Sequence, residues 1–433
     1  MFAIFSCDEM TLYVLPTLCS NARSFILGHY SLLNDKFDKN LIQLAKQYDG
    51  IFRLHLMLNE PHLIITDPQL VQKILTSYDF QGVANLRAIS YDLFGSGLVC
   101  AQGNNHKRQR KLMNPLFTFA NVKEMIPTFI QGGHQLKDHW INLIGDKKEE
   151  RISITSLISQ VTLDIIGLIG FNYEFNSLKV KSELAKAYEI MNSYNTSPLF
   201  GVLIDFFPFV RKLPFDYNIR YNNSLKIASK ISENLVIEHK NNPIKGKDLL
   251  SLLVETNEVT PDHEKLTHDE LVSQAFPDQN HQPTLDEIDQ LKYLECIFKE
   301  TVRIIPPSQV IHRITTKDEV LNDYIVPKGT RLQISINSIH HDPLIWGENV
   351  EEFVPSRWLD SELKITNYKF LPFGAGYKLC IGWRVASLEF KSLLIVLIRN
   401  LKFNVVEEFA FKKKPIGMAR PVPGIDLWIS KFE

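Results

Sequence analysis

The sequence predicts a mainly α-helical chain with small β-sheets, an α+β fold class, and three observations lead to it. Apolar residues recur at helical spacing after Thr284, whose hydroxyl forms a capping box with Glu287. Apolar residues alternate instead within residues 51–66 and 332–336, as they do in strands with one buried face. The recurring residues of the helical stretch are Leu285, Ile288, Leu291, Leu294, Phe298 and Val302.

The first sheet elements are expected near the N-terminus. Residues 51–66 read as a strand hairpin that turns at Asn59, Glu60 and Pro61. Asp67 and Pro68 follow, and this pair suits the cap and the first residue of a helix.

Helical patterns then dominate as far as Phe276, with breaks near Pro198 and Pro208. After the helix that follows Thr284, a strand over residues 332–336 is entered through the turn-forming residues 327–330. The sequence therefore predicts a helical body with small sheets near both ends.

Composition limits the function classes. The 433 residues are 45% hydrophobic and carry a formal net charge of −1, which argues against a nucleic-acid partner. The five cysteines show no paired spacing, which favours a reducing compartment over a disulfide scaffold. No repeat or low-complexity linker divides the chain, so one continuous domain is expected.

A cysteine in a glycine-rich loop is the most informative feature. Glycines let a backbone approach a flat cofactor closely, and the start of the helix that follows favours a thiolate. The alternative is a buried free cysteine, the common fate of a lone cysteine. The pattern F-x-x-G-x-x-x-C-x-G resembles the haem-ligand loop of the cytochrome P-450 family. Its residues are Phe373, Gly374, Gly376, Lys378, Cys380 and Gly382.

Two further motifs strengthen the resemblance. Glu300 and Arg303 form E-x-x-R on one helix face, and residues 353–358 read F-x-P-x-R-W with Arg357 as its arginine. By itself an E-x-x-R pair is usually a solvated surface pair. In the resembled family the Glu and Arg of the first motif bind the Arg of the second and brace the core around the haem.

The resemblance implies haem b, with the Cys380 thiolate as iron ligand and Phe373 packed against the loop. It also implies that His106, Arg110 and Arg313 contact the haem propionates. Lys378 stands where the family usually has an arginine, which keeps the charge and loses the forked geometry. Around His106 and Arg110 the basic run has two interpretations, a solvated face or a docking patch for an acidic redox partner; Lys107, Arg108 and Lys111 are expected to face outward.

One departure from the family concerns the distal face of the haem. The family carries a long helix there with an acid–Thr pair that manages oxygen chemistry. Residues 267–276 begin such a helix, but Pro277 ends it after about ten residues, or about 15 Å. We therefore expect a segment to be missing between Phe276 and Pro277, an incomplete P-450 fold, and no assignable catalytic residues. Such a chain is expected to fold poorly or bind haem weakly, and to release reduced oxygen species.

By resemblance the function is that of a haem-thiolate monooxygenase. It inserts one oxygen atom from dioxygen into a lipophilic substrate, with electrons from a separate NADPH-dependent reductase. Two alternatives stay open: a truncated, impaired haem-binding relative, and a reductase-independent hydroperoxide isomerase or dehydratase. Candidate pocket residues are Val310, Ile311, Ile416 and Met418.

The N-terminus also departs from the family, whose eukaryotic members sit on the cytosolic face of the endoplasmic reticulum membrane. Residues 1–24 hold no clear membrane span, because Asp8 and Glu9 interrupt them, and residues 25–433 form the haem domain. A cytoplasmic location or a peripheral membrane contact is expected instead. The apolar, aromatic stretch 198–209 fits such a contact or a plain core segment equally well.

Overall fold

The computed structural model describes residues 29, 37–48, 50–55, 60–82, 95–179, 183–193, 207–241, 292–360, 365–406, 412–413, 419, 421–422 and 424–432. The predicted junction between Phe276 and Pro277, the stretch 198–206, and the pocket candidates Ile416 and Met418 lie outside these residues.

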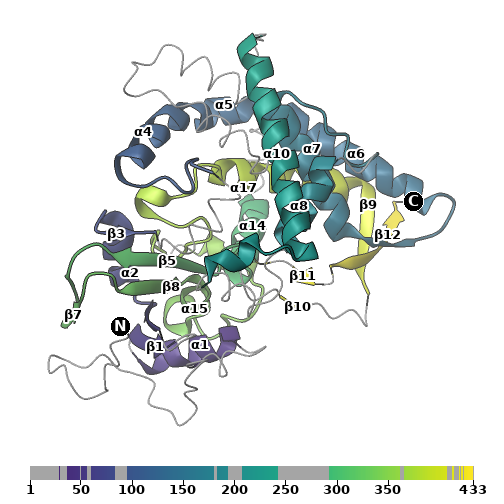
Figure 1. Ribbon diagram of the computed structural model, residues 1–433. Helices are drawn as coiled ribbons and strands as arrows, with labels where there is room; N and C mark the ends of the chain where they lie inside the picture. Colours follow the sequence, from purple (N-terminus) through teal and green to yellow (C-terminus); the bar gives the residue numbers. More distant parts are fainter. Residues whose placement is uncertain are drawn as a thin grey trace.

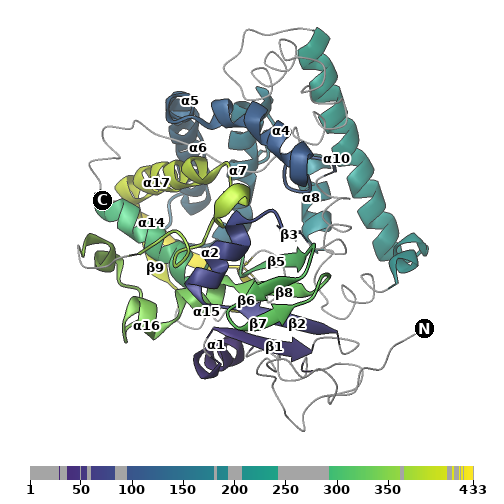
Figure 2. The ribbon, with the colours of Figure 1, turned by 90° about the vertical axis from the view of Figure 1, so that its left-hand side faces the viewer.

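Helices make up most of the described chain, as the sequence predicts (Figures 1 and 2). The α-helices are α1 (Phe37–Gln47), α2 (Pro68–Thr76), α4 (Gly103–Met113), α5 (Phe119–Glu124), α6 (Ile126–Ile144), α7 (Ile154–Phe171), α8 (Glu183–Ser193), α10 (Asp216–Asn241), α14 (Lys292–Ile304), α15 (Ile336–His340), α16 (Pro343–Trp346) and α17 (Trp383–Asn400). Short 3-10 helices are η3 (Asn114–Phe117), η4 (Pro208–Lys212), η5 (Pro355–Leu359) and η6 (Gly376–Lys378).

The strands form small sheets, and the largest has the order β1-β2-β8-β5-β3. Its members are β1 (Ile51–His55), β2 (Pro61–Ile65), β3 (Phe80–Gln81), β5 (Val310–Thr315) and β8 (Arg331–Ser335). The others are β4 (Glu150–Ser153), β6 (Glu319–Leu321), β7 (Tyr324–Val326), β9 (Leu401–Val405), β10 (Lys412–Lys413), β11 (Pro421–Val422) and β12 (Asp426–Lys431), in the sheets β4-β12-β9, β6-β7 and β10-β11. A mainly helical chain with small sheets is thereby confirmed.

The predicted hairpin is present at the edge of the large sheet. Ile51 pairs with Ile65 and His55 with Pro61 in an antiparallel register. Helix α2 begins as the sequence predicts: the Asp67 carboxylate accepts a hydrogen bond from the Leu70 amide at 2.8 Å, and Pro68 is the first helical residue.

The predicted second strand ends one residue earlier than expected. Ile336 is not part of β8 but the first residue of α15, because the Ser335 hydroxyl accepts from the Ser338 amide and so caps a helix at that point. Strand β8 lies between β2, to which it is parallel, and β5, to which it is antiparallel.

The helical body is held together by close approach of three helices. Helix α6 packs against α7 and α17, and two adjacent glycines on α6 make the approach possible. A Cβ atom on Gly132 would lie 2.5 Å from Ile165 of α7, and one on Gly133 would lie 3.1 Å from Val396 of α17. Both figures show α10 beside α8 at one side of this body.

Among the described helices, α7 alone is long and apolar enough to cross a membrane. Its position in the core explains that composition. Val161 and Ile165 belong to the cluster around Trp140, whereas Leu163 and Ile166 belong to a second cluster with Tyr221. A helix that buries two faces has no need of a polar one.

Replacing Gly132 with Val is expected to lower the free energy of unfolding by about 1–3 kcal/mol, because the added atoms overlap Ile165. Chemical denaturation would measure the loss. Gln135→Val places the same side chain on an exposed position of the same helix and serves as the control. Equal stability of the two variants would contradict the proposed close contact.

Candidate haem-binding site

The Cys380 loop is a tightly hydrogen-bonded turn that leads into α17. The Gly374 amide donates to the Leu371 carbonyl at 3.0 Å, and the Cys380 amide donates to the Phe373 carbonyl at 2.9 Å. The Cys380 side chain is partly exposed, and α17 begins three residues later at Trp383. The turn therefore fixes the cysteine backbone while the residue stays partly exposed.

Two glycines give this loop its shape. Gly374 and Gly376 have φ angles of +70° and +69°, in the left-handed region that residues with a Cβ rarely adopt. A Cβ on Gly376 would also lie 2.0 Å from the Leu75 carbonyl oxygen at the end of α2. Gly376 is thus required twice, for its own conformation and for the contact with α2.

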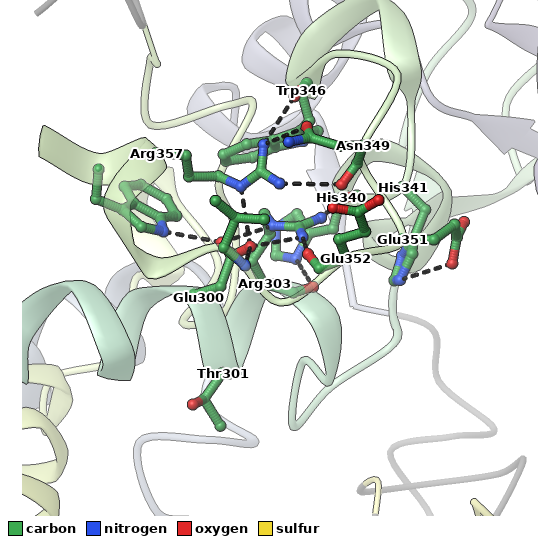
Figure 3. Close-up of polar contacts among 12 residues, drawn as sticks. Glu300, Thr301, Arg303, His340, His341, Trp346, Asn349, Glu351, Glu352 and Arg357 are labelled. Atoms are coloured by element: carbon green, nitrogen blue, oxygen red, sulfur yellow. Dashed lines mark hydrogen bonds and ion pairs between the residues drawn. The ribbon is translucent and has the colours of Figure 1, made fainter. Parts of the chain in front are cut away.

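A buried charge network joins α14 to η5 and the residues before it (Figure 3). Arg303 donates from Nε and Nη2 to the two carboxylate oxygens of Glu300, both at 2.9 Å, and Arg357 donates from Nε to Oε1 of Glu300 at 2.9 Å. The Val354 amide and the Trp358 indole complete the shell at 3.0 and 2.9 Å. Glu300 and Arg303 are fully buried.

The network satisfies the charges that it buries. Burial by itself raises the pKa of Glu300, but the hydrogen bonds from Arg303, the Val354 amide and Arg357 lower it, and the net pKa lies below the ordinary value. Further bonds anchor the arginines to the surrounding backbone. Arg303 donates to the His340 and Glu352 carbonyls at 2.8 and 3.1 Å, and Arg357 to the Trp346 carbonyl at 2.9 Å.

Comparison with known proteins shows to which family the chain belongs. The Cytochrome P-450 family profile matches residues 20–277 and 272–427, which is most of the chain. The chain belongs to the cytochrome P-450 family. It is 26% identical to cytochrome P-450 monooxygenase 128 of Postia placenta, an alignment that covers 92% of this chain and 88% of the relative. It is 25% identical to cytochrome P-450 734A1 of Arabidopsis thaliana, covering 84% and 77%, and 25% identical to cytochrome P-450 monooxygenase claP of Ampulloclitocybe clavipes, covering 88% and 85%.

The P-450 match has a break. Its two pieces meet at residues 272–277, where Phe276 and Pro277 lie. The alignment to the Postia placenta relative runs over 479 positions, whereas 92% of 433 residues is about 398, so about 81 positions have no residue of this chain opposite them. A missing segment at this junction stays a prediction.

Around the P-450 loop, basic side chains from remote segments converge. Arg110 of α4 donates to the Leu379 carbonyl at 2.5 Å, beside the cysteine. Burial lowers the pKa of Arg110 and the nearby Cys380 raises it, with a net decrease. Lys378 donates to carbonyl oxygens of the segment before α4, among them those of Leu98 and Ala101.

His106 and Arg313 carry buried nitrogen atoms that lack a protein partner in the described structure, His106 Nδ1 and Arg313 Nε. Burial, together with the positive charges of Lys378 and Arg110, lowers the pKa of His106 to about 4. Burial also lowers the pKa of Arg313, an effect that its contact with Tyr377 opposes. A guanidinium Nε donates, and a neutral imidazole donates from Nδ1 in one of its tautomers, so these residues fit the carboxylates of a haem.

Tyr377 joins these groups, although the motif marks its position only as variable. Its hydroxyl donates to the Phe80 carbonyl at 2.8 Å. Its ring stacks on that of Tyr78 with 4.3 Å between the ring centroids, and it meets the His106 ring edge-on with 5.9 Å between the centroids. The hydroxyl also interacts with Arg313. No periodicity or spacing in the sequence predicts that Tyr377 makes these contacts.

The other predicted residues fall as follows. Lys107 and Lys111 are exposed, and Arg108 is half-buried. Phe373 stacks against Phe298 of α14 at 6.2 Å. Ile311 of β5 lies near the loop, since a Cβ on Gly374 would be 3.8 Å from it.

A buried pair that sequence reasoning missed connects α14 to α17. Lys391 forms a short ion pair with Glu295, and Ser387 donates to the same carboxylate at 3.3 Å. Burial raises the pKa of Glu295, yet Lys391 and Lys299 lower it to a net value below the ordinary one. The pair couples the E-x-x-R helix to the helix that follows the cysteine.

Replacing Glu300 with Ala is expected to cost about 3–5 kcal/mol of folding free energy, because two buried arginines lose their counter-charge. Urea denaturation would measure it. Glu352→Ala is the matched control, since Glu352 joins the network through its carbonyl only and its side chain is exposed. A Glu300 variant as stable as that control would contradict the assigned role.

Proposed function

We propose that this chain binds haem through the Cys380 thiolate and acts as a monooxygenase on a lipophilic organic substrate, with electrons from a separate NADPH-dependent reductase. The observation that carries the proposal is the convergence on one loop of a partly exposed cysteine and two buried nitrogen atoms, His106 Nδ1 and Arg313 Nε, that find no hydrogen-bond partner among the described residues. The cysteine suits the iron, and the donors suit the propionates of the same cofactor.

Each residue then has a defined task. Cys380 supplies the thiolate, and the positive charge of Arg110 nearby favours its ionised form. Gly374 and Gly376 bring the backbone close to the cofactor face, and Phe373 packs between the loop and α14. When bound, a thiolate-ligated haem supplies the chemistry of oxygen activation.

The proposed substrate pocket includes residues of strand β5. Val310 and Ile311 are half-buried on β5, the strand that also carries Arg313, so apolar side chains lie on the same strand as a propionate donor. A lipophilic substrate fits such a lining.

A second candidate is an impaired form that holds haem but rarely oxidises substrate. The break of the family match at residues 272–277 favours it, because the distal acid–Thr pair of the family would fall in the missing segment. A site without those side chains admits water and loses control over proton delivery.

Peripheral contact with the endoplasmic reticulum membrane is proposed for the segment before α10. Phe207, Phe209 and Phe215 are 47%, 61% and 52% exposed, which is unusual for large aromatic side chains. Aromatic residues favour the boundary between lipid and water.

The thiolate ligation is tested by adding hemin to the purified chain and recording the spectrum of the reduced carbon-monoxide adduct. A red-shifted, thiolate-type band is expected, and Cys380→Ser should abolish it. Cys296→Ala removes a buried thiol away from the loop and should leave the band unchanged. Haem uptake without thiolate ligation, or a band that survives Cys380→Ser, would refute the proposal.

Electron use separates the two candidates. With a P-450 reductase and NADPH, the impaired form is expected to send most electrons to hydrogen peroxide, because water reaches the site. Peroxide and NADPH would be measured together. Tight coupling of NADPH oxidation to product would favour the intact monooxygenase, and consumption of a fatty hydroperoxide without reductase would favour an isomerase or dehydratase.

A further inference from the structure

Two adjacent histidines lie at the end of helix α15, and the first of them, His340, binds the stretch that leads into the cysteine loop. His340 is fully buried. Its ring stacks on that of Phe370 with 5.5 Å between the ring centroids. It meets the Trp346 ring edge-on with 6.2 Å between the centroids. Such packing leaves the imidazole little freedom to turn.

Both ring nitrogens of His340 bind backbone groups of different segments. The Leu371 amide donates to Nε2 at 2.8 Å, and Nδ1 lies 3.1 Å from the Arg303 carbonyl oxygen. An amide can only donate and a carbonyl can only accept, so Nε2 is the acceptor and Nδ1 carries the hydrogen. The neutral imidazole matches both partners at once.

Together with the backbone bonds of the loop, these bonds connect the charge network to the backbone amide of Cys380. Arg303, which binds Glu300, also donates from Nη1 to the His340 carbonyl at 2.8 Å. Beyond the imidazole, the Leu371 carbonyl accepts from the Gly374 amide, and the Phe373 carbonyl accepts from the Cys380 amide. His340 is the one side chain along this path that touches both α14 and the stretch leading into the loop.

We propose that His340 is a positioning residue for the Cys380 loop. Its imidazole fixes the backbone that carries Cys380 relative to the Glu300–Arg303 network. The spectroscopic part of this inference rests on the proposed haem ligation. Its structural part, the anchoring of Leu371, holds for the protein without haem.

His341 offers a matched control. It is also buried, at 7% exposure, but its Nδ1 lies 2.9 Å from the Asn337 carbonyl oxygen of its own helix. Its Nε2 lies 4.0 Å from the exposed Glu351 carboxylate, so removing this imidazole alters one buried histidine while the bonds of His340 to Leu371 and Arg303 stay in place.

Three variants dissect the two bonds. His340→Phe keeps a planar ring against Phe370 and loses both bonds. His340→Gln can place an oxygen near the Nε2 position and accept from Leu371, whereas His340→Asn can only reproduce the donor at Nδ1.

Hydrogen exchange of the Leu371 amide in the haem-free protein gives the first measurement. About tenfold faster exchange is expected in His340→Phe and His340→Asn, the factor that corresponds to one lost buried hydrogen bond. His340→Gln should restore slow exchange, and His341→Phe should leave it unchanged. Equal exchange in His340→Phe and His341→Phe would overturn the inference.

The second measurement is the fraction of thiolate-type carbon-monoxide adduct in the hemin-loaded protein. His340→Phe is expected to lower this fraction severalfold and His340→Gln to recover it, with His341→Phe like the unaltered chain. An unaltered chain that forms no thiolate adduct would refute the proposed function but leave the exchange test decisive. A normal adduct in all variants would refute the positioning role alone.

Discussion

The fully buried carboxylate of Glu300 is the constraint on which the arrangement around the cysteine depends. A charge in the protein interior is tolerated only when it is paired and fully hydrogen-bonded. Glu300 meets that condition with donors from its own helix, from η5 and from the segment that precedes it. Because all donors must be in place together, α14 and the stretch 352–358 can adopt one relative position only. Through His340 the same constraint extends to the loop that carries Cys380.

Positive side chains from α4, β5 and η6 contact residues of the cysteine loop. Arg110 interacts with Cys380 and Arg313 with Tyr377, and the hydrogen bonds of Arg110 and Arg313 go to uncharged oxygen acceptors. Their pKa values are lowered by burial. A polypeptide that concentrates donors in this way is arranged for an anionic ligand, and the two propionates of a haem have the required charge. The Glu300 network braces the core, and in the proposed function the basic side chains would hold the propionates of the cofactor.

The distal side raises a different question. The helices that pack tightly in the described chain, α6, α7 and α17, use small residues and continuous apolar faces to do so. The break in the family match at residues 272–277 falls outside this bundle. The predicted shortening of the distal helix therefore concerns other residues than those of the cysteine loop and the Glu300 network.

The amino-acid sequence alone determined the fold class, the Cys380 loop and the pair of motifs that form the Glu300 network, because each depends on local spacing: a helical turn for Glu300 and Arg303, and a glycine-rich turn for the cysteine. It also determined the cap at Asp67, which needs only neighbouring residues. Only the tertiary structure decided the roles of Tyr377, His340 and the Glu295–Lys391 pair. Their hydrogen-bond and ion-pair partners lie between 31 and 297 residues away along the chain. No local sequence pattern indicates contacts over such separations. The end of β8 at Ser335 was likewise decided by a side-chain cap that competes with strand alternation. Caps and turns depend on neighbouring residues, so the sequence predicts them directly. Contacts between distant segments depend on how the whole chain packs.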